Sequence, residues 1–157
     1  MKQEFGDESA PVTKPEIREV AQSDSAQGSI QISNDFDIVR ARAKARAIAQ
    51  EIGFGLVDQT RIATAVSELA RNVITHAVKG LVEITPVSST GIASDGIEIV
   101  VRDDGPGIVD IKQAMRDGYS SGHGLGTGLG GTRRLMDEFE IESVAGKGTT
   151  VCVRKWL

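Results

Sequence analysis

The sequence predicts a two-layer α/β sandwich, not a doubly wound parallel sheet. Two long helical patterns come early in the chain, whereas four strand patterns cluster after residue 80. A parallel sheet needs helices and strands that alternate along the chain, and this chain separates them. Its 157 residues are enough for one domain with a sizeable core.

The first helix follows a short alternating strand, Ser29–Ser33. Asn34 or Asp35 can cap its start, and Gly53 and Gly55 end it. Its apolar positions keep helical spacing and are Ile38, Ala41, Ala45, Ile48, Ala49 and Ile52.

The second helix is expected to open at Asp58 and to run to about Lys79, where Gly80 stops it. One face of it is apolar and holds Ile62, Ala65, Val66, Leu69, Val73 and Ala77.

The second half of the chain is predicted to form the sheet. Strands are expected at 81–87 and 96–102, joined by a loop rich in Ser, Thr and Gly. A short helix is predicted at 131–138, and a closing β-hairpin joins 140–144 to 149–155.

Residues 1–28 differ from the rest in composition. They hold three basic and six acidic residues and show little apolar periodicity. We therefore expect a disordered or weakly ordered acidic tail, followed by one folded domain at 29–157.

The overall composition excludes several classes of function. A net charge of −4 argues against nucleic acid or anionic membrane as the main partner. No apolar run approaches the ~18 residues that cross a bilayer, and no signal-peptide pattern opens the chain. The single cysteine, Cys152, excludes an intrachain disulfide and a four-cysteine zinc site. These features favour the cytoplasm.

Four polar residues form a row along the second helix. Thr64, Glu68, Asn72 and His76 are spaced four apart, beside the apolar stripe. Glu68 can orient a hydroxyl nucleophile and accept its proton. Asn72 can supply an oxygen to Mg²⁺, which takes few protein ligands when phosphates provide others. The alternative is a solvated helix face.

A second cluster follows the apolar run Ile99–Val101. Asp103 there can accept a hydrogen bond from the exocyclic amine of adenine, where guanine has a carbonyl oxygen. Gly105 and Gly107 let the backbone approach a flat base. The alternative is a plain Asp-Gly-Pro-Gly turn.

The third cluster is the glycine-rich stretch 122–131. Its alternating glycines expose backbone N–H groups just before a helix start, which suits phosphate. No strand precedes it, so the dinucleotide-binding fingerprint does not apply. The Walker pattern fails because Gly146-Lys147 is followed by Gly148. The alternative is a flexible linker.

Together these clusters resemble the GHKL superfamily of ATPases and kinases. The order Glu68-Leu-Ala-Arg-Asn72, Asp103-Asp-Gly-Pro-Gly107, a glycine-rich lid and Gly148-Thr149 is similar to its motifs, over about residues 29–157. Segments 53–59, 67–72, 131–139, 143–149 and 155–157 resemble the anti-sigma-factor type of serine kinase, especially the RsbT type of stressosome switch kinase.

The resemblance implies a Bergerat-type sandwich, with helices over one face of a mixed, mainly antiparallel sheet, and a pocket for ATP and Mg²⁺. It implies that Glu68 is the general base and that Asn72 binds the Mg²⁺. The other implied nucleotide positions are Asp103, Gly105 and Gly107 at the adenine, Thr149 supporting adenine recognition through water, and Gly124, Leu125, Gly126, Thr127, Gly128, Leu129 and Gly130 in the lid.

The implied activity is that of an ATP-dependent serine/threonine protein kinase. It implies phosphorylation of a STAS-domain protein in bacterial partner switching, followed by binding and activation of a PPM-type phosphatase. Two alternatives stay open. One is an anti-sigma factor that sequesters a sigma factor and phosphorylates its antagonist. The other is a non-catalytic module that activates a phosphatase, although such a binder has no need of Glu68 as a base.

Overall fold

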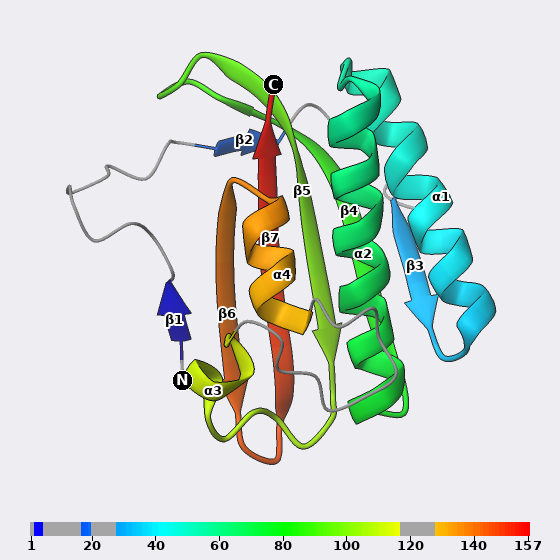
Figure 1. Cartoon of the computed structure of the whole chain (residues 1–157), viewed down its shortest axis with the longest axis vertical. Coiled ribbons are helices and arrows are strands. Elements are labelled where there is room, and N and C mark those ends of the chain that lie inside the picture. Colours follow the sequence, from blue (N-terminus) through cyan, green and yellow to red (C-terminus); the bar gives the residue numbers. More distant parts are fainter. Residues whose placement is uncertain (1, 5–16, 20–27, 117–127) are drawn as a thin grey trace.

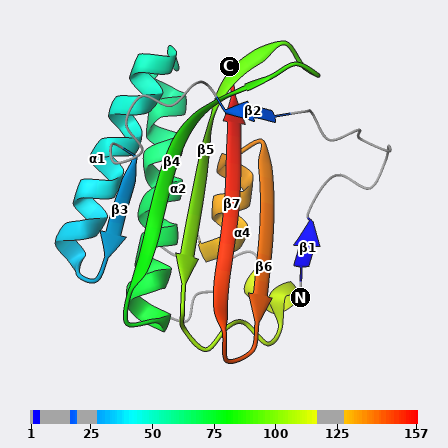
Figure 2. The same ribbon diagram turned by 180° about the vertical axis from the view of Figure 1, so that it is seen from behind.

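The structure is a computed structural model that describes residues 2–4, 17–19, 28–116 and 128–157. Its elements are β1 (Lys2–Glu4), β2 (Ile17–Glu19), β3 (Ser29–Ile32), α1 (Asp35–Ile52), α2 (Leu56–His76), β4 (Gly80–Ser89), β5 (Ser94–Asp103), α3 (Ile111–Ala114), α4 (Gly128–Leu135), β6 (Glu138–Val144) and β7 (Gly148–Trp156). The strands form one sheet, and α1, α2 and α4 cover one of its faces (Figures 1 and 2). The predicted two-layer sandwich is confirmed.

The sheet has the strand order β1-β6-β7-β5-β4-β2, and β3 pairs with another part of β4. Every pairing among the described strands is antiparallel, so the mixed component that we expected is not found there. The chain order explains two of these pairings, because β4–β5 and β6–β7 are hairpins and a short turn joins antiparallel strands. In the β5–β7 pairing, Asp103 lies opposite Thr149.

The first helix has the predicted limits because both of its ends are capped. Asn34 and Asp37 form a reciprocal capping box, in which each side chain accepts a hydrogen bond from the backbone of the other. Gly53 ends the helix with a φ of +113°, a left-handed conformation that favours glycine.

Several boundaries differ from the prediction. Helix α2 starts two residues before Asp58 and ends at His76, because Ala77 is extended and the chain enters β4 at Gly80. Helix α4 spans Gly128–Leu135 instead of 131–138, and the strands are longer at their ends. The short helix α3 was not predicted, since four residues carry no readable periodicity.

The core lies between the helices and the sheet. Leu69 and Ile62 of α2 face Val82, Ile99 and similar strand residues, and all four are almost completely buried. Helix α1 packs against α2 through fully buried alanines, which let the two helices approach closely. This packing fixes α2 beside the ends of β5 and β7, where the candidate site lies.

Two short parts of the predicted tail pair with the sheet. Lys2–Glu4 pairs with Glu140–Glu142 on β6, and Ile17–Glu19 pairs with Val87–Ser89 on β4. The rest of residues 1–27 lies outside the described residues, so the predicted disorder there stays a prediction. Within the described part of the chain, no helix is long and apolar enough to span a bilayer.

Candidate functional site

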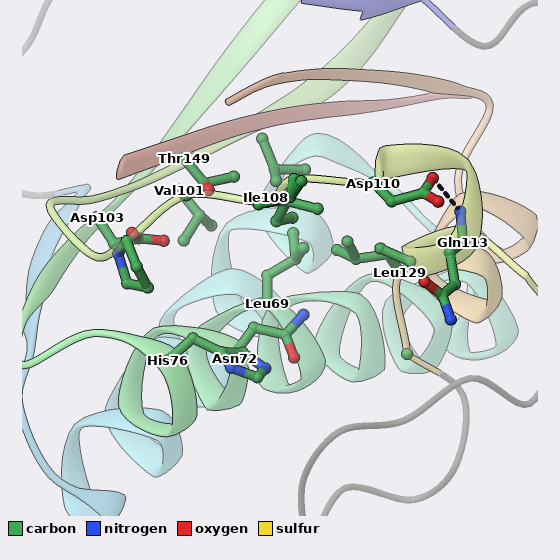
Figure 3. A pocket seen from close by; sticks show the side chains of 16 residues that line it. Leu69, Asn72, His76, Val101, Asp103, Ile108, Asp110, Gln113, Leu129 and Thr149 are labelled. Carbon is green, nitrogen blue, oxygen red and sulfur yellow. Dashed lines mark hydrogen bonds between the residues drawn. The ribbon is translucent and has the colours of Figure 1, made fainter. Parts of the chain in front are cut away.

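A cavity of about 530 Å³ lies between α2, the adjacent ends of β5 and β7, and the starts of α3 and α4 (Figure 3). Four separate stretches of chain contribute to its wall, 69–76, 101–114, 128–129 and 149–151. The lining residues are Leu69, Asn72, His76, Val101, Asp103, Pro106, Gly107, Ile108, Val109, Asp110, Gln113, Ala114, Gly128, Leu129, Thr149 and Val151.

Asp103 supplies a carboxylate at one end of the cavity, beside Thr149 (Figure 3). Burial raises the pKa of Asp103, and backbone hydrogen bonds from Gly105 and Thr149 oppose that rise. The Gly105 N–H donates to Asp103 Oδ1 at 2.9 Å. The side chain is therefore held in one orientation while the cavity removes much of its water.

Ser143 ties two walls of the cavity together, although it does not line the cavity itself. Its Oγ accepts a hydrogen bond from the Ile108 N–H at 2.7 Å and lies 2.9 Å from Thr149 Oγ1. The Thr149 hydroxyl is thus positioned from behind by a buried serine.

Two glycines allow the loops at this end to pack closely. Gly107 has a φ of +77°, and a Cβ there would lie 2.5 Å from the Val144 carbonyl oxygen. Gly148 has a φ of +110°, and a Cβ there would overlap the Asp103 carbonyl oxygen. Gly105, which is not among the lining residues, packs against the end of α2 at His76. Side chains at these positions would push the walls of the cavity apart.

The polar row on α2 is divided in the structure. Asn72 and His76 line the cavity, whereas Glu68 does not. The Glu68 side chain is buried with 3% exposure, and no hydrogen bond or ion pair joins it to another described residue. The solvated-face alternative does not hold for Glu68, because it is inside the protein.

Part of the predicted lid reaches the cavity. Gly128 and Leu129, the first residues of α4, line it, and Gly130 is buried just behind them. The N-terminal end of this helix therefore meets the cavity, where the helix dipole and the first N–H groups favour a negative group. Gly124, Leu125, Gly126 and Thr127 lie outside the described residues.

Several site residues were missed by the sequence reasoning. Asp110 caps α3 by accepting a hydrogen bond from the Gln113 N–H at 3.0 Å, and both residues line the end of the cavity away from Asp103 (Figure 3). His76 was seen only as part of a row. The role of Ser143 depends on strand register, for which the sequence has no local signal.

The chemistry of the cavity follows from its two ends. Aliphatic side chains, including Leu69, Val101 and Ile108, form the middle of the wall and suit a flat apolar ring. A buried carboxylate lies at one end, while an amide from Asn72 and the start of α4 lie along the wall towards the other. This combination can hold a base with an exocyclic amine and an attached anionic group.

Known proteins match this chain over most of its length. The histidine kinase-like ATPase domain family matches residues 31–155. Serine/threonine-protein kinase RsbT of Bacillus subtilis (strain 168) is 50% identical over 131 residues, which cover 83% of this chain and 97% of that protein. Anti-sigma F factor of Thermoanaerobacter sp. (strain X514) is 33% identical over 120 residues, covering 74% and 83%.

A solved structure agrees on the fold alone. The mycobacterial sensor histidine kinase MprB has a TM-score of 0.50 and 14% identity, and the match covers 82% of this chain and 95% of that one. This structural match shows the fold, while the family match and the 50% identity to RsbT show the family. The chain belongs to the histidine kinase-like ATPase domain family, in its branch of RsbT-like serine/threonine-protein kinases.

Proposed function

We propose that this chain uses ATP and Mg²⁺ to phosphorylate a serine or threonine of a STAS-domain protein, in a bacterial partner-switching pathway of the cytoplasm. The observation that carries this proposal is the shared cavity. It brings together Asn72 of α2, Asp103 of β5, Gly128 of α4 and Thr149 of β7, which are far apart in the sequence. The similarity to RsbT supports the choice of protein hydroxyl as acceptor.

The Asp103 end of the cavity suits adenine. Its carboxylate accepts a hydrogen bond from the exocyclic amine, and the carbonyl oxygen of guanine would be repelled there. The Thr149 hydroxyl, fixed by Ser143 at 2.9 Å, lies beside it and can hold a bridging water. Gly107 leaves room for the ring because it has no side chain.

The Asn72 side chain suits Mg²⁺ bound mainly by phosphates. Mg²⁺ prefers oxygen ligands and keeps several waters, so one amide oxygen is a sufficient protein contribution. When bound, Mg²⁺ neutralises charge on the phosphates during transfer. Among the described residues, no group of three His, Cys, Asp or Glu side chains forms a separate metal site.

Glu68 is proposed as the group that accepts the proton of the acceptor hydroxyl. It lies one helical turn from Asn72 on α2 and is 3% exposed. Glutamate is seldom buried so completely, and buried carboxylates are common at catalytic sites, which supports a chemical role for this side chain. Because it does not line the cavity, a protein hydroxyl can reach it only after the local packing around α2 rearranges.

The central experiment is a phosphoryl-transfer assay with labelled ATP and a purified STAS-domain protein. Glu68→Gln keeps the shape of the side chain and should lower the transfer rate by roughly 10²–10⁴-fold. Its affinity for ATP, measured by calorimetry, should stay near that of the wild type. Glu51→Gln, an exposed change on α1, is the matched control. Transfer by Glu68→Gln at the wild-type rate would exclude Glu68 as the base.

A second variant tests the adenine contact. Asp103→Asn removes the charge and can present a donor where an acceptor is needed, so ATP affinity should fall by about tenfold or more. GTP has a carbonyl oxygen where ATP has this amine, so it should bind the wild type far more weakly than ATP. Equal ATP affinity of the two proteins would reject the contact.

A second candidate function is that of an anti-sigma factor, which the 33% identity to Anti-sigma F factor favours. Such a protein would sequester a sigma factor and phosphorylate its antagonist. Direct binding of a purified sigma factor to the ATP-loaded chain would support it.

A further part of the proposal is that the kinase binds and activates a PPM-type phosphatase after it leaves the STAS protein. If Glu68→Gln activates the phosphatase as well as the wild type does, activation is independent of transfer. If the wild type shows no transfer at all, a non-catalytic phosphatase-activating module becomes the better description.

A further inference from the structure

The described wall of the nucleotide cavity carries no lysine or arginine. Of the lining residues that the structure describes, only His76 can carry a positive charge, and that side chain lies on the Asp103 side (Figure 3). Arg71 and Lys112 adjoin lining residues in the chain but do not line the cavity themselves. Residues 117–127, which precede α4 in the sequence, contain no lysine or arginine either. The described wall therefore offers the phosphates of a nucleotide very little positive charge.

The start of α4 supplies only part of the missing charge. A helix N-terminus acts as roughly half a positive charge, whereas the phosphates of ADP or ATP carry several negative charges. Mg²⁺ can supply the balance, since phosphate oxygens and waters provide most of its ligands and few come from the protein. The cavity wall must then attract the ion as well as the phosphates, and oxygen atoms with negative charge do so.

In the proposed binding mode, the phosphates extend towards the end of the cavity that Asp110 lines. His76 lies near Asp103 at the adenine end, and Asn72 is one turn nearer the start of α2 (Figure 3). A nucleotide with its base at Asp103 therefore runs along α2 past Asn72. It reaches the opposite end of the cavity, where Gly128 opens α4 and where Asp110 also lies.

The Asp110 carboxylate is fixed by one oxygen and leaves the other available. Asp110 Oδ1 accepts a hydrogen bond from the Gln113 N–H at 3.0 Å, as the cap of α3. No hydrogen bond or ion pair joins Oδ2 to any part of the chain that the structure describes. The residue is exposed at the cavity wall, so this oxygen can accept a hydrogen bond from water there.

We propose that Asp110 is a second protein group that holds the Mg²⁺ of the nucleotide, with Oδ2 accepting a hydrogen bond from a water bound to the ion. The inference rests on the proposed function, because it takes the ligand to be an adenine nucleotide with Mg²⁺. Asn72 offers a neutral oxygen, whereas Asp110 adds a negative charge that attracts the ion. The same charge repels phosphates that lack the ion. Asp110 therefore makes nucleotide binding depend on Mg²⁺ and selects the Mg²⁺ complex over the free nucleotide.

The test is calorimetry of the full chain with AMP-PNP, a non-hydrolysable analogue of ATP, in Mg²⁺ and in EDTA. Asp110→Asn keeps the cap of α3, because asparagine caps as well as aspartate, and removes the charge. We expect it to weaken binding of the Mg²⁺ complex by roughly 3–10-fold and to strengthen binding of the free nucleotide by about twofold, the scale of an exposed charge pair. The ratio of the two affinities should therefore fall by about tenfold.

Asp104→Asn is the matched control, because Asp104 is exposed in the same loop but does not line the cavity. It removes the same charge and should change the ratio by less than about twofold. Asp110→Ser repeats the test with a second uncharged capping residue and should behave as Asp110→Asn does. Thermal unfolding of all three variants should match the wild type, which shows that the fold is intact.

An unchanged ratio in Asp110→Asn and Asp110→Ser overturns the proposal. Equal loss of affinity with and without Mg²⁺ also overturns it, because Asp110 then touches the nucleotide itself, for example a ribose hydroxyl. An equal fall of the ratio in Asp104→Asn overturns it too, since the effect is then a general one of charge on the loop. If the wild type binds no adenine nucleotide, both the proposed function and this inference fail, whereas binding with an unchanged ratio removes only the role of Asp110.

Discussion

The hydroxyl of Ser143 offers a sharp test of how the cavity is held together. Ser143→Ala removes an acceptor from the Ile108 N–H, which lies 2.7 Å away, and a partner from Thr149 Oγ1 at 2.9 Å. The same hydroxyl also lies 3.3 Å from the Gly148 carbonyl oxygen. Ser143 is 3% exposed, so water cannot easily replace the lost bonds.

The expected magnitude follows from these bonds. A buried donor left without an acceptor costs about 1–3 kcal/mol, and a net loss of about 2 kcal/mol in the free energy of unfolding is expected. For a chain of this size, this corresponds to a drop in Tm of roughly 4–8 °C. Ile108 and Thr149 both line the cavity, so ADP affinity should also fall, by about tenfold or 1.4 kcal/mol.

The assay is denaturant unfolding of both proteins, followed by calorimetry with ADP. Ser88→Ala is the control, because its Oγ makes a comparable 2.7 Å hydrogen bond to Asp95 but is exposed. That variant should lie within about 0.5 kcal/mol of the wild type. If Ser143→Ala also leaves both the free energy of unfolding and the ADP affinity near their wild-type values, Ser143 does not organise the cavity.

Three further predictions concern glycine, charge and thiol chemistry. Gly148→Ala should lose about 2–4 kcal/mol of stability in denaturant unfolding, because the φ of Gly148 is +110° and the new Cβ meets the Asp103 carbonyl. In the control Gly146→Ala the new Cβ meets nothing, so the loss should be only about 1 kcal/mol. Equal losses in the two variants would contradict the steric explanation. Burial raises the pKa of Asp103 above its usual 3.8, so the folded chain holds this proton more tightly than the unfolded chain. Its contribution to stability is then lost as pH rises from the usual 3.8 through the raised pKa, so the wild type should lose stability relative to Asp103→Asn over that rise. Parallel pH curves of the two proteins would refute this. Burial also raises the pKa of Cys152 to about 12, so iodoacetamide at about pH 8 should modify the folded chain much more slowly than the unfolded chain.

Local signals allowed much of the fold to be predicted. Asn34 and Gly53 mark the ends of α1 because caps depend on a few neighbouring residues. The position of Asp103 at the end of β5 was readable, since an apolar run leads to it and glycines follow it. Because two helices precede two hairpins, the two-layer arrangement followed from the order of elements.

Features that depend on distant packing could not be predicted. The burial of Glu68 results from tertiary packing of α2, and α4, against which α2 packs, comes 60 residues later in the chain. The spacing of four residues showed that Glu68 and Asn72 share one side of α2, but not that only Asn72 reaches the cavity. Ser143 acts through the register of β6 and β7 and through a loop 35 residues away.

The pairing of Asp103 with Thr149 limits how this chain can change in length. Both residues belong to one rung of the β5–β7 ladder, and neighbouring residues on a strand point to opposite faces. Losing or gaining a single residue inside β5 would turn Asp103 away from the helices and disconnect it from its hydroxyl neighbour. The β4–β5 turn lies at the far end of the same strands, so insertions there leave the rung intact. Natural variation in length should therefore accumulate in that turn, while β5 keeps a constant number of residues.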